Sequence, residues 1–312
     1  MRGLAVFIFS LGVSSFGATS PETKVWLDLD QAALDKAYDQ SAYAPNLEQV
    51  LGRFASNSNA ARAVLGEPRR HAYGEHPDET LDVYATDRTG APIHVFIHGG
   101  AWKLGTAHDN AHAAEMFVRA GINYVVPDFS PVQAFNGELL PMVEQLRRAL
   151  AWLYLHAEET FGGNPDRIYL SGFSSGAHLA AVLLTTDWAA QPWMPADVIK
   201  GGLLCSGMYD LEPVSLSYRR EYVNFSPAIV AALSPLRHFN RINCPVVVAY
   251  GTYETPEFQR QARQFHEAFA ASGRPSELLV GEGYNHFEII ETLGSPYGLL
   301  GRAALGQIAD SP

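Results

Sequence analysis

The sequence predicts an α/β fold in which a mostly parallel central sheet carries helices on both faces. Short apolar runs typical of strands alternate with longer amphipathic runs typical of helices, and that alternation implies parallel strands. Glycine, proline and asparagine clusters separate the runs. The chain has 312 residues, 47% hydrophobic and 18% charged, which is enough to bury a large core. We therefore expect a single domain over residues 19–312.

The first part of the chain shows no strand pattern. Residues 30–65 are helix-prone, with a break at Pro45, and predict a helical layer or lid added to the sheet. Residues 1–18 resemble a secretory signal peptide, because Arg2 precedes a short apolar stretch that ends in small residues. Two localisations stay open: an exported protein, periplasmic or secreted, or a cytoplasmic protein that keeps this segment.

The strands are expected to begin after residue 80. Residues 81–85 alternate apolar and polar side chains, as an edge or half-buried strand does, whereas residues 93–97 are mostly apolar, as in a central strand. A helix is expected over 110–120, followed by a strand over 122–126.

The second half continues the alternation. Pro141 can open a helix whose apolar residues recur at three- and four-residue spacing until the glycines at 162 and 163. Residues 209–240 form a long polar and aromatic stretch that we expect to build a pocket or lid insertion. The remaining expected strands are 167–170, 198–204, 245–250 and 277–280, and the remaining expected helices are 177–184 and 256–272.

The motif Gly172-Phe173-Ser174-Ser175-Gly176 lies between an expected strand and an expected helix. A turn this sharp forces the serine into a strained backbone conformation and leaves no space for side chains two residues to either side. Ser174 is therefore the candidate nucleophile.

A serine hydroxyl needs a base, and the base needs a carboxylate that fixes its tautomer. His286 follows the last expected strand, and loops after parallel strands converge on one edge of the sheet. Glu254 follows the preceding strand and is the favoured acid. Asp210 is the alternative acid, and Glu257 is a third choice because Pro256 is expected to begin a helix there.

A second motif, His98-Gly99-Gly100-Ala101-Trp102, follows the expected strand 93–97. The glycines let the backbone approach a substrate, so the amides of Gly99 and Gly100, with that of Ser175, can form an oxyanion hole. His98 is expected to hold this loop by a hydrogen bond, and Trp102 to pack beneath it.

Composition and spacing exclude several other functions. A net charge of −11 without basic runs argues against nucleic-acid or membrane surfaces, so we expect a small aryl or acyl substrate as the partner; a homodimer is compatible with the sequence. His108 and His112 are one helical turn apart but do not complete a zinc motif, so no metal is expected. The sequence contains no nucleotide-binding fingerprint, so no organic cofactor is expected. Cys205 and Cys244 are expected to be buried thiols.

Given these motifs, the chain resembles the α/β-hydrolase superfamily, and within it the esterase and kynurenine formamidase (arylformamidase) group. The resemblance extends from about Leu29 to Leu293, and the His98–Trp102 motif is its most specific part. Residues 73–84 look like the group's first strands, and residues 285–287 like its catalytic-histidine loop. The chain departs from the group at Glu254, where relatives often have aspartate, and in its signal-like N-terminus.

The resemblance implies an α/β-hydrolase fold and a serine hydrolase with Ser174, His286 and Glu254 as its triad. N-formylkynurenine or a related aryl formamide is the first expected substrate, and an aryl or xenobiotic ester or carbamate is the alternative. A non-catalytic binding protein with this fold is a remote third. Four aromatic residues could hold an aryl group or belong to the core: Tyr218, Tyr222, Phe225 and Phe239.

Overall fold

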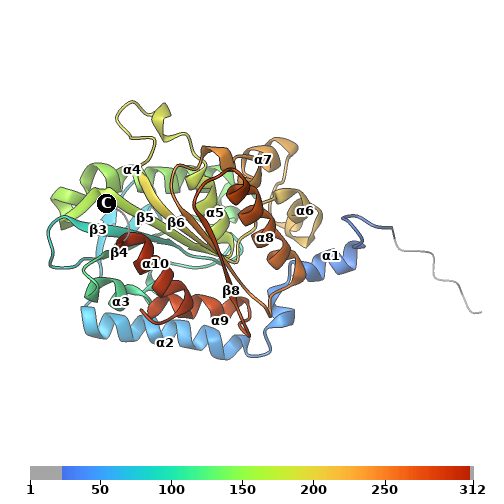
Figure 1. Ribbon diagram of the computed structural model, residues 1–312, viewed down its shortest axis with the longest axis horizontal. Coiled ribbons are helices and arrows are strands. Elements are labelled where there is room, and N and C mark those ends of the chain that lie inside the picture. Colours follow the sequence, from blue (N-terminus) through green and yellow to red (C-terminus); the bar gives the residue numbers. More distant parts are fainter. Residues whose placement is uncertain (1–22, 310–312) are drawn as a thin grey trace, which may run out of the picture.

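The computed structural model describes residues 23–309, and the signal-like segment 1–18 lies outside this range. An eight-stranded sheet runs through the molecule in the order β1-β2-β4-β3-β5-β6-β7-β8 (Figure 1). β1 and β2 are antiparallel to their neighbours, and every pairing from β4 to β8 is parallel. The predicted mostly parallel sheet is therefore confirmed. The strands are β1 Arg69–Ala72, β2 Thr80–Tyr84, β3 Ala91–Ile97, β4 Asn123–Pro127, β5 Gly163–Phe173, β6 Ile199–Cys205, β7 Val246–Gly251 and β8 Ser276–Gly281.

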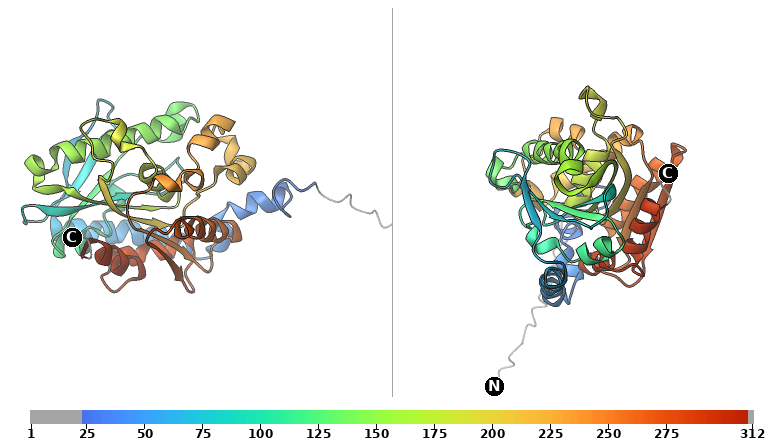
Figure 2. Two further views of the ribbon diagram at one scale, coloured as in Figure 1. Left: turned by 45° about the horizontal axis from the view of Figure 1, so that its top comes forward. Right: turned by 90° about the vertical axis from the view of Figure 1, so that its left-hand side faces the viewer.

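Helices cover both faces of the sheet (Figures 1 and 2). One face packs against α4, α5 and α8, and the other against α3, α9 and α10. The helices are α1 Gln31–Ala37, α2 Leu47–Leu65, α3 Ala114–Arg119, α4 Leu140–Phe161, α5 Ser175–Leu184, α6 Leu211–Leu216, α7 Pro227–Ala232, α8 Pro256–Ala271, α9 His286–Ile289 and α10 Leu299–Ala309. No helix within residues 23–309 is both long and apolar enough to cross a membrane.

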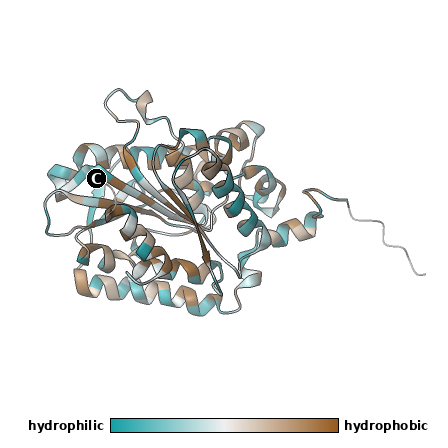
Figure 3. Cartoon of the chain, in the orientation of Figure 1, coloured by the Kyte–Doolittle hydropathy of each residue, from teal (hydrophilic) through white to brown (hydrophobic). Residues whose placement is uncertain are grey.

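The outer helices α4 and α8 are amphipathic and turn their apolar sides to the sheet, whereas α5 is buried along its whole length. Pro141 lies in the first turn of α4, and Gly162 ends it in a left-handed conformation, as the sequence predicts. In α8, Phe258, Phe265 and Phe269 are fully buried against the sheet. Figure 3 shows the same division, with hydrophobic strands inside and hydrophilic residues along the outer side of α8.

Two expectations for the N-terminal half are wrong in detail. β2 is an interior strand, because β1 pairs with its outer side, and its Asp82 is fully buried in an ion pair with Arg70 of β1. β1 escaped prediction because two arginines and a histidine interrupt any apolar alternation. The helix expected over 110–120 is confined to α3, since residues 108–110 form a short 3₁₀ helix instead.

The helical stretch at 30–65 divides into two parts. α1 and the following 3₁₀ helix, η1 (Gln40–Tyr43), lie near the carboxyl ends of the central strands, where Gln40 reaches Glu254. α2 instead runs along the far side of α3 and α9 (Figure 1). Only the first part is placed where it could cover a site at that edge of the sheet.

Candidate active site

Ser174 lies at the turn between β5 and α5. Its φ of 56° and ψ of −123° are strained for a residue with a side chain, as the motif predicts. The two outer glycines are needed for close packing: a Cβ on Gly172 would collide with the carbonyl of Gly176, and a Cβ on Gly176 with those of Ile97 and His98. The backbone therefore holds the Ser174 hydroxyl at the carboxyl ends of the strands.

The structure brings Ser174, His286 and Glu254 together in one hydrogen-bonded chain. His286 Nε2 lies 3.0 Å from Ser174 Oγ, and His286 Nδ1 lies 2.8 Å from Glu254 Oε2. Because the carboxylate accepts the Nδ1 proton, Nε2 is left as the acceptor that faces the serine hydroxyl. The three side chains come from three different loops and are all buried. This arrangement can withdraw the hydroxyl proton as the oxygen attacks a carbonyl.

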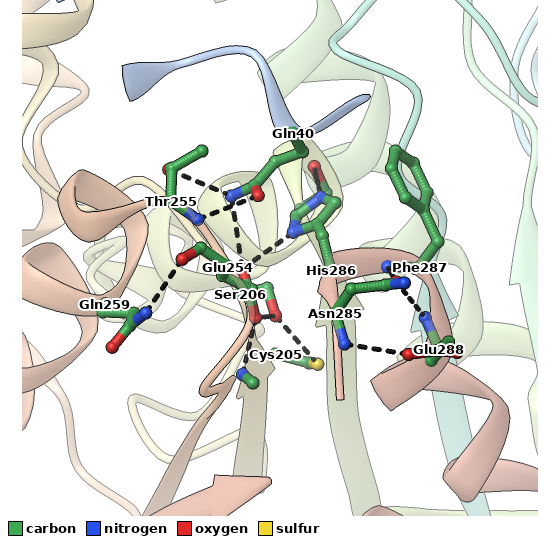
Figure 4. A network of polar contacts seen from close by, with 12 residues as sticks. Gln40, Cys205, Ser206, Glu254, Thr255, Gln259, Asn285, His286, Phe287 and Glu288 are labelled. Carbon is green, nitrogen blue, oxygen red and sulfur yellow. Dashed lines mark hydrogen bonds and ion pairs between the residues drawn. The ribbon is translucent and has the colours of Figure 1, made fainter. Parts of the chain in front are cut away.

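Glu254 is held by more than the histidine (Figure 4). Its Oε1 accepts hydrogen bonds from Ser206 Oγ at 2.6 Å and from the amide of Gly251 at 2.7 Å. Gln40 Nε2 lies 3.4 Å from Oε2, and the Gln40 carboxamide oxygen accepts the amide of Thr255. Sequence reasoning missed Ser206 and Gln40. A polar residue directly after an apolar strand was an available signal for Ser206, but Gln40 had none.

The other two candidate acids lie elsewhere. Asp210 caps α6 by accepting the amide of Glu212, and it faces Arg237 at 3.7 Å. Glu257, in the first turn of α8, pairs with Arg260 and accepts a hydrogen bond from the Tyr38 hydroxyl. Neither carboxylate contacts His286, so among the three it is Glu254 that the structure brings to the histidine.

The segment His98–Trp102 follows β3 and has a strained backbone. Gly100, Ala101 and Trp102 have φ values of 116°, 56° and 62°, three consecutive residues in the left-handed region. Gly99 lies against the nucleophile, because a Cβ on it would be 3.1 Å from Ser174 Cβ. The backbone of this segment is therefore next to the atom that would attack a substrate.

Trp102 fastens the segment to α5 with both of its N–H groups. Its amide donates to Ser175 Oγ at 3.1 Å, and its indole N–H donates to His178 Nδ1 at 3.2 Å. Nε2 of His178 in turn donates to the carbonyl of Leu233 at 2.8 Å. Burial lowers the pKa of His178 to about 4, which keeps the imidazole neutral and able to accept from Trp102. Trp102 thus packs under the loop as expected.

His98 also supports the loop. Its Nδ1 lies 2.9 Å from the carbonyl of Gly99, and its ring stacks on Phe129. Burial lowers the pKa of His98, so the ring is neutral and donates through Nδ1.

Several amides beside Ser174 remain available to a ligand. Within residues 23–309, no hydrogen bond uses the amide N–H of Gly99, Gly100 or Ser175. Ser175 begins α5, where unpaired N–H groups and the helix dipole favour negative charge. Such donors are suited to an oxyanion at the carbonyl that Ser174 would attack.

The remaining residues of interest divide between the site and the core. Phe225 meets Trp102 edge-on, and Tyr222 lies under the ammonium of Lys103, whereas Phe239 contacts Arg274 through its carbonyl.

Cys205 and Cys244 are buried free thiols. His112 is half-buried beside Phe96, and the described part of the chain holds no group of three or more potential metal ligands.

The chain is similar to several known hydrolases. The profile of the family BD-FAE matches residues 81–192, a range that contains both the His98–Trp102 and Gly172–Gly176 motifs. Kynurenine formamidase of Danio rerio is 29% identical over 92% of this chain and 99% of its own length. The same enzyme of Salmo salar is 28% identical over 86% of this chain and 93% of its own length.

Other relatives are esterases. A probable isoprenylcysteine alpha-carbonyl methylesterase of Oryza sativa is 27% identical, covering 78% of this chain and 61% of its own length. Among solved structures, a candidate thioesterase of Silicibacter sp. TM1040 is 26% identical with a TM-score of 0.76, covering 87% of this chain and 98% of its own. Esterase LipW of Mycobacterium marinum shares the fold with a TM-score of 0.67 at 16% identity, covering 87% and 90% of the two chains.

Proposed function

We propose that this chain, which has an α/β-hydrolase fold and resembles esterases and kynurenine formamidases, is a serine hydrolase working through an acyl-enzyme. The observation that carries this proposal is the buried chain of hydrogen bonds from Ser174 through His286 to Glu254. Serine alone is a weak nucleophile, and this chain supplies the base and the carboxylate that activate it.

The reaction takes place in two halves. Ser174 Oγ attacks the substrate carbonyl while His286 Nε2 accepts the hydroxyl proton, which it then donates to the leaving amine or alcohol. The oxyanion of the tetrahedral intermediate is bound by the free amides of Gly99, Gly100 and Ser175. In the second half, His286 activates water, which attacks the acyl-enzyme and releases the acid and Ser174. Glu254 stabilises the imidazolium that forms twice in the cycle.

The first proposed substrate is an aryl formamide such as N-formylkynurenine. Its support is the similarity to two fish kynurenine formamidases, which extends over nearly their whole length. The second candidate is an aryl or xenobiotic ester or carbamate, supported by the similarity to methylesterases and esterases.

Steady-state kinetics separate the two. We would compare kcat/KM for N-formylkynurenine and for a short-chain aryl ester, with Ser174→Ala as the blank. A strong preference for the formamide supports formamidase activity. Cleavage of the ester alone supports a serine hydrolase whose substrates are esters rather than formamides. A folded protein that a fluorophosphonate does not label at Ser174 would contradict the hydrolase proposal and favour a binding protein.

A further inference from the structure

A buried arginine beside the candidate active site has no acid partner. Arg219 is 5% exposed and lies in the 3₁₀ helix η5 (Tyr218–Glu221). Its guanidinium donates to the Tyr222 hydroxyl at 2.7 Å and to the carbonyl of Tyr38 at 3.0 Å, and its Nε has no hydrogen-bond partner. No ion pair within residues 23–309 includes Arg219.

An unpaired buried charge is costly, because two neutral oxygens do not replace the water that a guanidinium loses. By contrast, the largely buried carboxylates Asp82 and Glu257 are each paired with an arginine, Arg70 and Arg260 respectively. The unpaired Nε of the buried Arg219 guanidinium therefore indicates a partner that the protein itself does not supply. A negatively charged ligand would supply that partner.

A second cation contacts the ring of Tyr222, whose hydroxyl accepts from Arg219. The ammonium of Lys103 is 4.4 Å from the centroid of the Tyr222 ring, and the ion pairs of the described residues do not include Lys103 either. Lys103 directly follows Trp102 in the loop that carries the free amides. Two cations without acid partners thus flank one tyrosine next to that loop.

Arg219 is linked through neighbouring side chains to Ser175 and to His286. Its Cζ lies 5.8 Å from the Trp102 ring, and the amide of Trp102 donates to Ser175, the residue after the nucleophile. On the other side, Tyr38 packs on Phe258, whose ring stands 5.1 Å from the imidazole of His286.

We propose that Arg219, assisted by Lys103, binds a carboxylate of the substrate. Arginine is suited to this because its planar donors match a carboxylate, and Nε with an Nη is one of its binding edges. The proposal rests on the hydrolase function proposed above and narrows its substrates to amides or esters that carry a carboxylate as well as the scissile group. N-formylkynurenine meets this requirement, whereas simple aryl esters do not.

The test compares substrates that differ only in this charge. We would measure kcat/KM for N-formylkynurenine and for its carboxamide, following formate release, in the wild type and in Arg219→Met, Lys103→Met and Arg220→Met. Arg220 is the matched control, since it is the exposed neighbour of Arg219 and its loss changes the net charge equally. Because charge-assisted hydrogen bonds are the strong ones, we expect the wild type to favour the carboxylate by about tenfold or more.

Arg219→Met should bring that ratio close to one, mainly through KM, and Lys103→Met should lower it less. Arg220→Met should leave it unchanged. A wild-type ratio near one overturns the proposal, as does a ratio that survives in both Arg219→Met and Lys103→Met. The latter result would make Arg219 a purely structural tie between Tyr38 and Tyr222.

Thermal unfolding with benzoate or benzamide as the added ligand tests the anion site without any turnover. Benzoate should raise the Tm of the wild type more than benzamide does, and this difference should shrink in Lys103→Met, even if Arg219→Met fails to fold. If neither formamide is cleaved but benzoate stabilises, the proposed substrate fails and the anion site stands. Equal shifts with both ligands would contradict the site whatever the activity.

Discussion

The two ends of the candidate site differ in how completely their polar groups are paired. At the acid end, each oxygen of Glu254 accepts hydrogen bonds from within the protein, including those of Ser206 and His286. At the oxyanion end, the amides of Gly100 and Ser175 have no acceptor within residues 23–309, and the nearby Arg219 has no counter-ion there. Glu254 and Ser175 are buried, and Gly100 is half-buried.

This difference separates groups that position from groups that bind. A buried carboxylate with every oxygen paired is fixed before any substrate arrives, so its work is to orient His286. Unpaired buried donors are costly unless a ligand completes them, which suits them to charge that exists only in the bound state. Changes at the acid end and at the oxyanion amides should therefore lower kcat, because both act on charge that forms during the reaction, whereas changes at Arg219 should act mainly through KM.

The largest expected effect is at the acid. Glu254→Gln keeps the shape of the side chain but removes its charge and allows the wrong histidine tautomer, a change that typically costs triads about 10⁴ in kcat. Asp210→Asn is the matched control, since Asp210 caps α6 and does not reach His286. Steady-state kinetics on both variants check this. A larger loss in the Asp210 variant would reverse the assignment of the acid.

The next largest effect is expected at the oxyanion end. Gly100 has a φ of 116°, and a Cβ there would collide with the carbonyl of Leu104, so Gly100→Ala must displace the loop that carries the free amides. Loss of one oxyanion donor typically costs about 10²–10³ in kcat. Gly90→Ala is the control: Gly90 also has a positive φ, of 70°, but has open space around it and lies away from the site. Equal kinetics for both variants would contradict a role for the Gly100 amide.

The sequence predicts best the features that depend on neighbouring residues. The turn at Ser174 and the loop at His98–Trp102 need their own glycines, so a local motif describes each one. The parallel strands were predictable for the same reason, since their apolar runs are continuous.

Features that depend on distant residues were not predictable. Gln40 reaches Glu254 across 214 positions, and Arg70 of the edge strand β1 pairs with the buried Asp82 of β2. Neither residue has a pattern that points to its partner. Glu254 is favoured over Asp210 because its strand is expected to lie beside the strand that precedes His286. In the structure these two strands, β7 and β8, are paired.

A smaller effect is expected from Ser206, which supports the acid without touching Ser174. Ser206→Ala removes a 2.6 Å hydrogen bond to Glu254 and leaves that oxygen with the amide of Gly251. Because one of several partners is lost, we expect kcat to fall by about tenfold with little change in KM. Ser215→Ala is the control, since its hydroxyl bonds only to the carbonyl of Glu212. A change in KM instead of kcat would place Ser206 among the binding groups.

The last prediction concerns stability and uses the histidine that ties Trp102 to α5. Burial holds the pKa of His178 at about 4 in the folded protein, against an ordinary value near 6.5 in the unfolded chain. Between these pH values the unfolded state binds a proton that the folded state does not. The free energy of unfolding should therefore fall as the pH drops from about 6.5 to about 4, by up to about 1.4 kcal/mol per pH unit for this group.

His178→Asn removes the titration while its carboxamide oxygen can still accept from the Trp102 indole, so the pH slope should become shallower by up to one proton. Urea unfolding at several pH values measures that slope, and His108→Asn, which replaces an exposed histidine, is the control. His94 and His112, whose pKa values burial lowers to about 3 and about 4, keep part of the slope in both variants. If His178→Asn leaves the slope unchanged, burial does not lower the pKa of His178, and the neutral imidazole that accepts from the Trp102 indole is contradicted.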